Sequence, residues 1–121
     1  MSTGKRVMVV DDHVIVRQML CSLLTLQGFE VFAAEDGGQA LQRAQEVRPD
    51  LIILDFVMPV MNGIEAARAL KAVMPRVPLM MFTNTVGAIL DREARAAGIS
   101  IVVSKSEPAA YLIAQAKMLL N

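Results

Sequence analysis

Three carboxylates, a hydroxyl and an ammonium group could together bind a phosphoryl group in this chain. Each of the five residues directly follows a short apolar run or lies within two positions of its end: Asp11, Asp12, Asp55, Thr83 and Lys105. Clustered carboxylates repel one another, and a hard divalent cation is the simplest counter-charge. Because the candidate ligands are oxygens from only a few carboxylates, Mg²⁺ fits better than Zn²⁺ or an enclosed Ca²⁺. Metal, hydroxyl and ammonium together make a clamp for phosphoryl transfer, with an aspartate as the nucleophile.

Each of these residues also has an ordinary structural interpretation when it is taken alone. Asp12 fits the N-cap of a helix starting at His13, and His13 itself fits a solvated residue at a helix start better than a metal ligand. Asp55 fits a turn before Pro59, Lys105 a solvated charge beyond a strand, and Thr83 a β-branched strand residue. Their joint placement at one edge of a sheet would favour the chemical interpretation.

The elements that must position these residues alternate along the chain. Apolar, β-branched runs predict strands, and stretches of helical period predict helices between them. The predicted strands are residues 6–10, 30–34, 51–54, 79–82 and 99–103, and the predicted helices are roughly 13–27, 37–47, 63–73, 86–97 and 107–120. This (βα)5 alternation is typical of an α/β fold, a doubly wound five-stranded parallel sheet. We therefore expect one domain over residues 1–121, with a core from about 5 to 120.

An open parallel sheet binds ligands beyond the carboxyl ends of its strands, where the strand order switches. All five polar residues follow predicted strands, so the fold itself would gather them at that edge. The loop after the second strand holds Gly37 and Gly38 but lacks the lysine and the spacing of a nucleotide-binding phosphate loop. A nucleotide donor is therefore not indicated.

Composition excludes several other classes of protein. Twelve basic and twelve acidic residues balance in 121, which disfavours direct binding to nucleic acid or an anionic membrane. No apolar run approaches the length of a signal peptide or a membrane span, and a single cysteine, Cys21, forms no internal disulfide. We expect Cys21 to be a small buried apolar residue in a cytoplasmic protein.

The ordered set of motifs resembles a response-regulator receiver domain over nearly the whole chain. Asp11-Asp12 follows a first strand, Thr83 and Lys105 end the fourth and fifth, and Asp55 opens the segment Asp-Phe-Val-Met-Pro-Val-Met-Asn-Gly that ends at Gly63. The resemblance implies the flavodoxin-like strand order 2-1-3-4-5. It also implies a phosphorylation-dependent switch of a two-component or phosphorelay system, without turnover catalysis.

The same resemblance implies a role for each residue of the site. Asp55 would be the phosphoacceptor, with Lys105 and Thr83 contacting phosphate oxygens. Asp12 and Asp55 would ligate Mg²⁺ (or Mn²⁺) directly, Asp11 would act through a bound water, and the backbone carbonyl of Val57 would be a further ligand.

The implied partners are a histidine kinase or histidine phosphotransfer protein as donor and an output protein or domain. A homodimer through the face of the fourth and fifth helices is a further expectation. In the last helix, Tyr111, Ala114 and Met118 form one stripe beside a second made by Leu112, Ala116 and Leu119. At least one stripe is expected to face a partner or another subunit, and ordinary core packing accounts for most of these residues.

Three positions depart from the usual receiver pattern. Val102 stands where an aromatic residue commonly relays phosphorylation, Asn84 replaces a small residue after the switch hydroxyl, and Ser106 replaces a proline after the lysine. The departures leave phosphate acceptance intact, but the signal must then travel by another route. The alternative is a receiver-fold interaction module that is not phosphorylated. A phosphate-ester hydrolase is disfavoured because Val57 stands where the second aspartate of such enzymes would lie.

Overall fold

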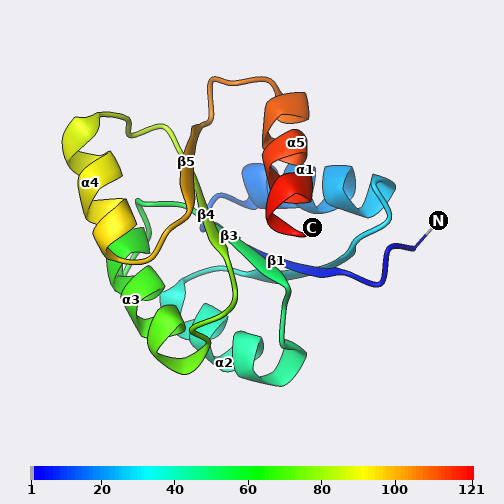
Figure 1. Ribbon diagram of the computed structural model, residues 1–121, viewed down its shortest axis with the longest axis horizontal. Helices are drawn as coiled ribbons and strands as arrows, with labels where there is room; N and C mark the ends of the chain where they lie inside the picture. The colour runs from blue at the N-terminus through cyan, green and yellow to red at the C-terminus, as the bar shows by residue number, and fades with distance from the viewer. Residues whose placement is uncertain (1) are drawn as a thin grey trace.

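Five strands and five helices alternate along the chain in the computed structural model, which describes residues 2–121 (Figure 1). The strands are β1 (Arg6–Val10), β2 (Glu30–Ala34), β3 (Leu51–Leu54), β4 (Leu79–Thr83) and β5 (Ile101–Ser104). The helices are α1 (Val14–Leu26), α2 (Gly37–Val47), α3 (Gly63–Val73), α4 (Ala88–Ala96) and α5 (Ala109–Leu119). The predicted (βα)5 alternation is confirmed.

All strand pairs are parallel, and the sheet has the order β2-β1-β3-β4-β5. The chain leaves β1 to add β2 on one side and then returns to add β3 on the other. The strand order therefore switches between β1 and β3, the place where an open parallel sheet binds its ligands. The expected flavodoxin-like order is correct.

Helices cover both faces of the sheet, with α1 and α5 on one side and α2, α3 and α4 on the other (Figure 1). Successive strand residues point to opposite faces, so each central strand supplies both cores. Met8, Val10, Ile52 and Leu54 belong to the core under α2, α3 and α4, whereas Val7, Val9, Leu51 and Ile53 belong to the core under α1 and α5. This double burial explains why β1 and β3 are almost wholly apolar.

Three predicted boundaries, the starts of β5, α4 and α5, are wrong by two residues each. The last helix, α5, begins at Ala109 after its N-cap Pro108, not at residue 107. The amide of Ile99 bonds to the carbonyl of Ala94, so Ile99 belongs to the turn that ends α4. The strand β5 therefore begins at Ile101 and not at residue 99. Gly98 has φ of 96°, a left-handed value that ends a helix at little cost for glycine. At the other end, α4 begins at Ala88 because Gly87, with φ of 146°, is its N-cap.

The structure does not support the alternative interpretation of Asp12 as a helix N-cap. The N-cap of α1 is His13, and no side chain caps that helix. The carboxylate of Asp11, not that of Asp12, accepts the backbone amide of His13 at 2.9 Å. Asp12 is left exposed beside the buried Asp11, and its carboxylate caps no helix.

Cys21 is half-buried and packs against the core under α1 and α5. Burial raises the pKa of its thiol, and the nearby Arg17 only partly opposes that rise. The unreactive thiol is therefore favoured at neutral pH, in line with the structural interpretation of this residue.

The turn into α3 is tightly determined. Asn62 caps the helix by accepting the amide of Glu65 at 2.9 Å, and the Glu65 side chain accepts the amide of Asn62 at 3.0 Å. The amide of Gly63 donates to the carbonyl of Phe56 at 2.7 Å, which draws the helix start against the end of β3. A Cβ at Gly63 would collide with the carbonyl oxygen of Asp55 and lie 2.8 Å from Phe56 Cα.

A Gly63→Ala variant is expected to lose about 2 kcal/mol of unfolding free energy, because backbone atoms meet the added methyl group and cannot move aside cheaply. Urea denaturation measures the loss. Gly38→Ala is the matched control, since its Cβ would meet only an Asp36 carboxylate oxygen at 3.3 Å, and we expect a change within about 0.5 kcal/mol. Equal stability of both variants would show that this close approach does not constrain the loop.

Candidate functional site

The carboxylates gather at the switch in strand order, as predicted. The amide of Asp55 bonds to the carbonyl of Val10 at 3.0 Å, which holds the end of β3 beside the end of β1. Asp11 and Asp55 are only 2% and 4% exposed, whereas Asp12 is exposed. Ligand atoms of Asp11, Asp12, His13 and Asp55 all lie within 4.8 Å of one another. The three carboxylates among them form a converging set of oxygen donors, which fits a small divalent cation that keeps several waters.

Lys105 lies between the two buried carboxylates. Its Nζ is 3.0 Å from Asp11 Oδ2 and 3.0 Å from Asp55 Oδ2, and its side chain is 9% exposed. Burial by itself lowers the pKa of Lys105, but hydrogen bonds to Asp55 and Asp11 and the charges of both outweigh it, so the pKa is raised. The ammonium therefore stays charged and supplies the cation that two buried carboxylates require.

Thr83 is 1% exposed at the end of β4. Its Oγ1 accepts the amide of Thr85 at 3.2 Å, so the hydroxyl proton is still available for donation. The carbonyl of Thr83 accepts the amide of Lys105 at 2.9 Å, which links the ends of β4 and β5. Asn84, the next residue, is exposed.

Several supporting contacts have no clear signal in the sequence. Arg17 donates from Nη1 to the carbonyl of Asp11 at 2.7 Å, one turn along α1. The Asp55 Oδ1 atom accepts the amide of Phe56 at 2.7 Å, which leaves Oδ2 for Lys105. The Lys105 ammonium also lies 5.9 Å from the centroid of the Phe82 ring. The only sign of the Arg17 contact in the sequence is the position of this basic residue, one turn into the first helix and six residues after Asp11.

His13 lies closer to the acids than the sequence suggested. Its Nδ1 is 3.4 Å from Asp11 Oδ1 and 3.4 Å from Asp12 Oδ1, although 64% of the side chain is exposed. The imidazole thus flanks the carboxylates at the surface and does not enter the buried part of the site.

Two further positions that the sequence singled out are Val57 and Val102. Val57 lies in the loop between β3 and α3 and is 58% exposed, and no backbone amide in residues 2–121 bonds to its carbonyl. Val102 is half-buried and packs against the core under α2, α3 and α4. A short branched side chain fills that position, so no aromatic ring can move there between inward and outward positions.

Fold and site together define a class, namely doubly wound α/β domains that carry an acidic, lysine-bridged site at the switch in strand order. The response regulator receiver domain family matches residues 7–117 of this chain. The chain belongs to that family and is a phosphorylation-dependent switch of two-component signalling.

Individual known proteins are also similar to this chain in sequence or in structure. The chain is 42% identical over 106 residues to a protein-glutamate methylesterase/protein-glutamine glutaminase of a Nocardioides strain, with 84% of this chain and 29% of that protein covered. It is 41% identical over 120 residues to the transcriptional regulatory protein PrrA of Mycobacterium bovis, with 98% and 51% covered. The structure of chemotaxis protein CheY4 of Vibrio cholerae matches with a TM-score of 0.92 at 32% identity, covering 98% of this chain and 100% of that one.

The chain thus spans about half or less of the two longer relatives. In residues 2–121, no helix is both long and apolar enough to cross a bilayer.

Proposed function

We propose that Asp55 accepts a phosphoryl group from the phosphohistidine of a histidine kinase or phosphotransfer protein, with Mg²⁺ bound by the neighbouring acids. The observation that carries the proposal is the position of Lys105, whose ammonium lies 3.0 Å from carboxylate oxygens of both Asp11 and Asp55. A fixed cation beside a carboxylate nucleophile neutralises charge where a phosphoryl group would arrive.

Asp12 and Asp55 would hold the metal directly, Asp11 through a water molecule, and Val57 through its carbonyl. The donor set fits Mg²⁺ or Mn²⁺, since it consists of oxygens with an exposed carboxylate at its open side. The metal would supply further neutralisation of the phosphoryl oxygens.

In the transfer, a carboxylate oxygen of Asp55 attacks phosphorus and the bond from phosphorus to the donor histidine nitrogen breaks. The nitrogen keeps the bonding pair, and the product is an acyl phosphate on Asp55. Lys105 then pairs with a phosphoryl oxygen in place of a carboxylate oxygen. Thr83 keeps a free hydroxyl proton that it can donate to another oxygen. Phosphorylation would therefore rearrange contacts at the ends of β3, β4 and β5.

Incubation with acetyl phosphate and Mg²⁺, followed by intact-mass measurement, tests the proposal. We expect one added phosphoryl group per chain, no adduct when the metal is chelated, and localisation of the adduct to Asp55 by peptide mapping. Absence of an adduct, or an adduct at another residue, would refute the proposal. Absence with an unchanged fold would favour an unphosphorylated interaction module, whereas continuous phosphate release from many esters would favour a hydrolase.

An Asp12→Asn variant is expected to bind Mg²⁺ about tenfold more weakly, because it loses one anionic ligand while the buried Asp11 and Asp55 stay in place. Isothermal titration with Mn²⁺ or Mg²⁺ measures the change. The fold should tolerate the substitution, since Asp12 caps no helix. Unchanged metal affinity would exclude Asp12 as a ligand.

For the partners, the proposal is a phosphohistidine donor, a separate output protein or domain, and a cytoplasmic setting. On α5, Leu112 and Ala116 are buried, whereas the stripe formed by Tyr111, Ala114 and Met118 is exposed. We propose this exposed stripe as the surface for an output partner, or, together with α4, for a homodimer. The domain would act as a phosphoacceptor without turnover catalysis.

A further inference from the structure

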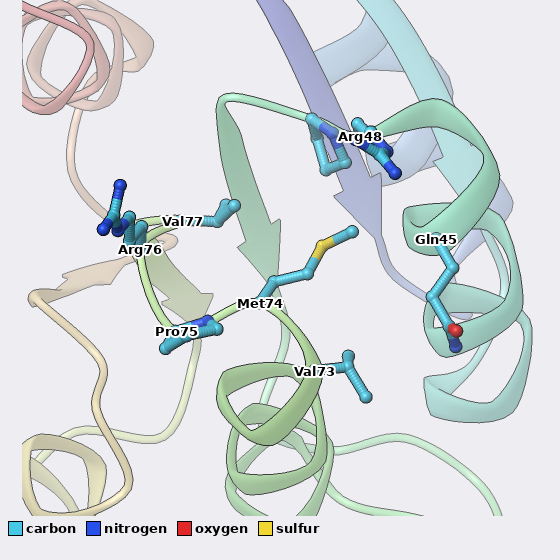
Figure 2. A pocket seen from close by; sticks show the side chains of 8 residues that line it. Gln45, Arg48, Val73, Met74, Pro75, Arg76 and Val77 are labelled. Atoms are coloured by element: carbon cyan, nitrogen blue, oxygen red, sulfur yellow. The ribbon is translucent and has the colours of Figure 1, made fainter.

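A pocket lies at the end of the sheet away from Asp55, between the connections that lead into β3 and β4. It has a volume of about 600 Å³, within the range of small-molecule sites. Eight residues line it: Gln45, Arg48, Pro49, Val73, Met74, Pro75, Arg76 and Val77. Figure 2 shows Met74 in the middle, with Arg48 and Gln45 to one side and Arg76 to the other.

The charge of this pocket is one-sided. No carboxylate lines it, and in residues 2–121 neither Arg48 nor Arg76 takes part in an ion pair. Lys71 is a third cation near the pocket. Its Nζ donates to the carbonyls of two lining residues, Pro75 at 3.4 Å and Val77 at 2.8 Å. Cations without counter-charges around a concave surface attract an anion.

The backbone at Arg48 gives a second, independent indication. Arg48 ends α2 with φ of 55° and ψ of 67°, the left-handed conformation that glycine normally adopts at this position. An arginine there costs about 1 kcal/mol relative to glycine, and the proline that follows restricts the residue further. Its guanidinium makes no hydrogen bond among the described residues that would offset this strain. Strain of this kind concentrates at binding sites.

We propose that this pocket binds a small organic phosphate of the nucleotide class. The phosphate groups would pair with Arg48 and Arg76, since guanidinium groups bind phosphate oxygens in a bidentate manner. The apolar side of the ligand would rest on Met74, Pro49 and Val77, and the Gln45 amide could meet a polar edge of a ring. The site is separate from phosphoryl acceptance, because Asp55 follows the carboxyl end of β3 whereas this pocket lies before its amino end.

Titration of the ¹⁵N-labelled protein with ADP, followed by amide chemical shifts in the presence of a chelator, tests the proposal. We expect saturable shifts confined to residues 45–48, 73, 74, 76 and 77, since Pro75 has no amide proton. Pyrophosphate and adenosine should each bind at least tenfold more weakly than ADP. Pyrophosphate lacks the nucleoside that would contact the apolar residues, and adenosine lacks the phosphate groups that would pair with the arginines. No saturable shift, shifts at the carboxyl ends of the strands, or equally tight pyrophosphate binding would overturn the proposal.

Arg48→Gly is the decisive variant, because glycine relieves the left-handed backbone while it removes the guanidinium. We expect ADP binding at least tenfold weaker with an unchanged or higher melting temperature, and at least fivefold weaker binding for Arg76→Gln. Arg92→Gln on exposed α4 is the matched control and should bind normally, as should Asp55→Asn. Normal ADP binding by Arg48→Gly, or displacement of ADP by lower concentrations of an acidic peptide, would contradict a nucleotide site.

Discussion

An Asp55→Asn variant is expected to gain no phosphoryl group from acetyl phosphate and Mg²⁺. The side-chain amide is close in shape to the carboxylate but is a very poor nucleophile, so the rate of incorporation should fall by roughly 10³-fold or more. Lys105 would keep Asp11 as a partner at 3.0 Å, and the fold should persist. Intact-mass measurement over time, with circular dichroism as the check on folding, gives the comparison.

Asp91→Asn is the matched control for this loss. Asp91 lies exposed in the first turn of α4, far along the chain from the acidic site, and makes no ion pair among residues 2–121. That variant should incorporate phosphate at the rate of the parent chain. Residual incorporation in Asp55→Asn at a comparable rate would place the acceptor elsewhere.

A Lys105→Met variant is expected to lose about 3 kcal/mol of unfolding free energy in the absence of divalent metal. Removing the ammonium leaves two carboxylates, 2% and 4% exposed, without their cation, and breaking a buried pair from one side is strongly destabilising. Mg²⁺ should restore more stability to the variant than to the parent, because the metal then supplies the missing positive charge. Urea denaturation with chelator and with Mg²⁺ measures both effects.

The difference in unfolding free energy between the parent chain and Lys105→Met should depend on pH in one direction. The pKa of Lys105 is raised in the folded protein above its ordinary value of 10.5. A raised lysine pKa contributes stability that is complete below the unfolded-state pKa and is lost as pH rises through the folded-state pKa. The gap between parent and Lys105→Met should therefore be constant at neutral and mildly alkaline pH and shrink only in strong alkali.

Lys117→Met controls for the loss of a lysine as such. Lys117 is exposed in the last turn of α5 and makes no ion pair among the described residues, so a change within about 0.5 kcal/mol is expected. If Lys105→Met were no less stable than this control, the bridge to Asp11 and Asp55 would contribute nothing to the fold.

Val102 bears on how the proposed phosphorylation of Asp55 would be transmitted. The residue is half-buried against the core under α2, α3 and α4, and it lies three positions before Lys105. Since no aromatic ring can change position there, we propose that a rearrangement of Thr83 would reach α4 through the loop that follows β4. Residues 84–87, which form that loop, are all exposed.

Sequence by itself determined the alternation of elements and the identity of the polar residues at the strand ends. Short-range physics suffices for these features: apolar runs such as residues 51–54 can be buried on both sides only as strands, and the residue after such a run must lie at the edge of a sheet. The strand order did not follow from that pattern. It came from the resemblance of the motifs to a family, and the structure confirms it.

Only the tertiary structure decided which of these residues touch. Lys105 reaches across the ends of β4 and β3 to Asp55, 50 residues away in the chain, and to Asp11 beyond it, because the twist and packing of the whole sheet set that distance. It also decided that Asp11, and not Asp12, takes the amide of His13. Likewise, the left-handed Arg48 became visible only in the folded chain. Side-chain reach and backbone strain depend on neighbours that are distant in sequence, which no local pattern encodes.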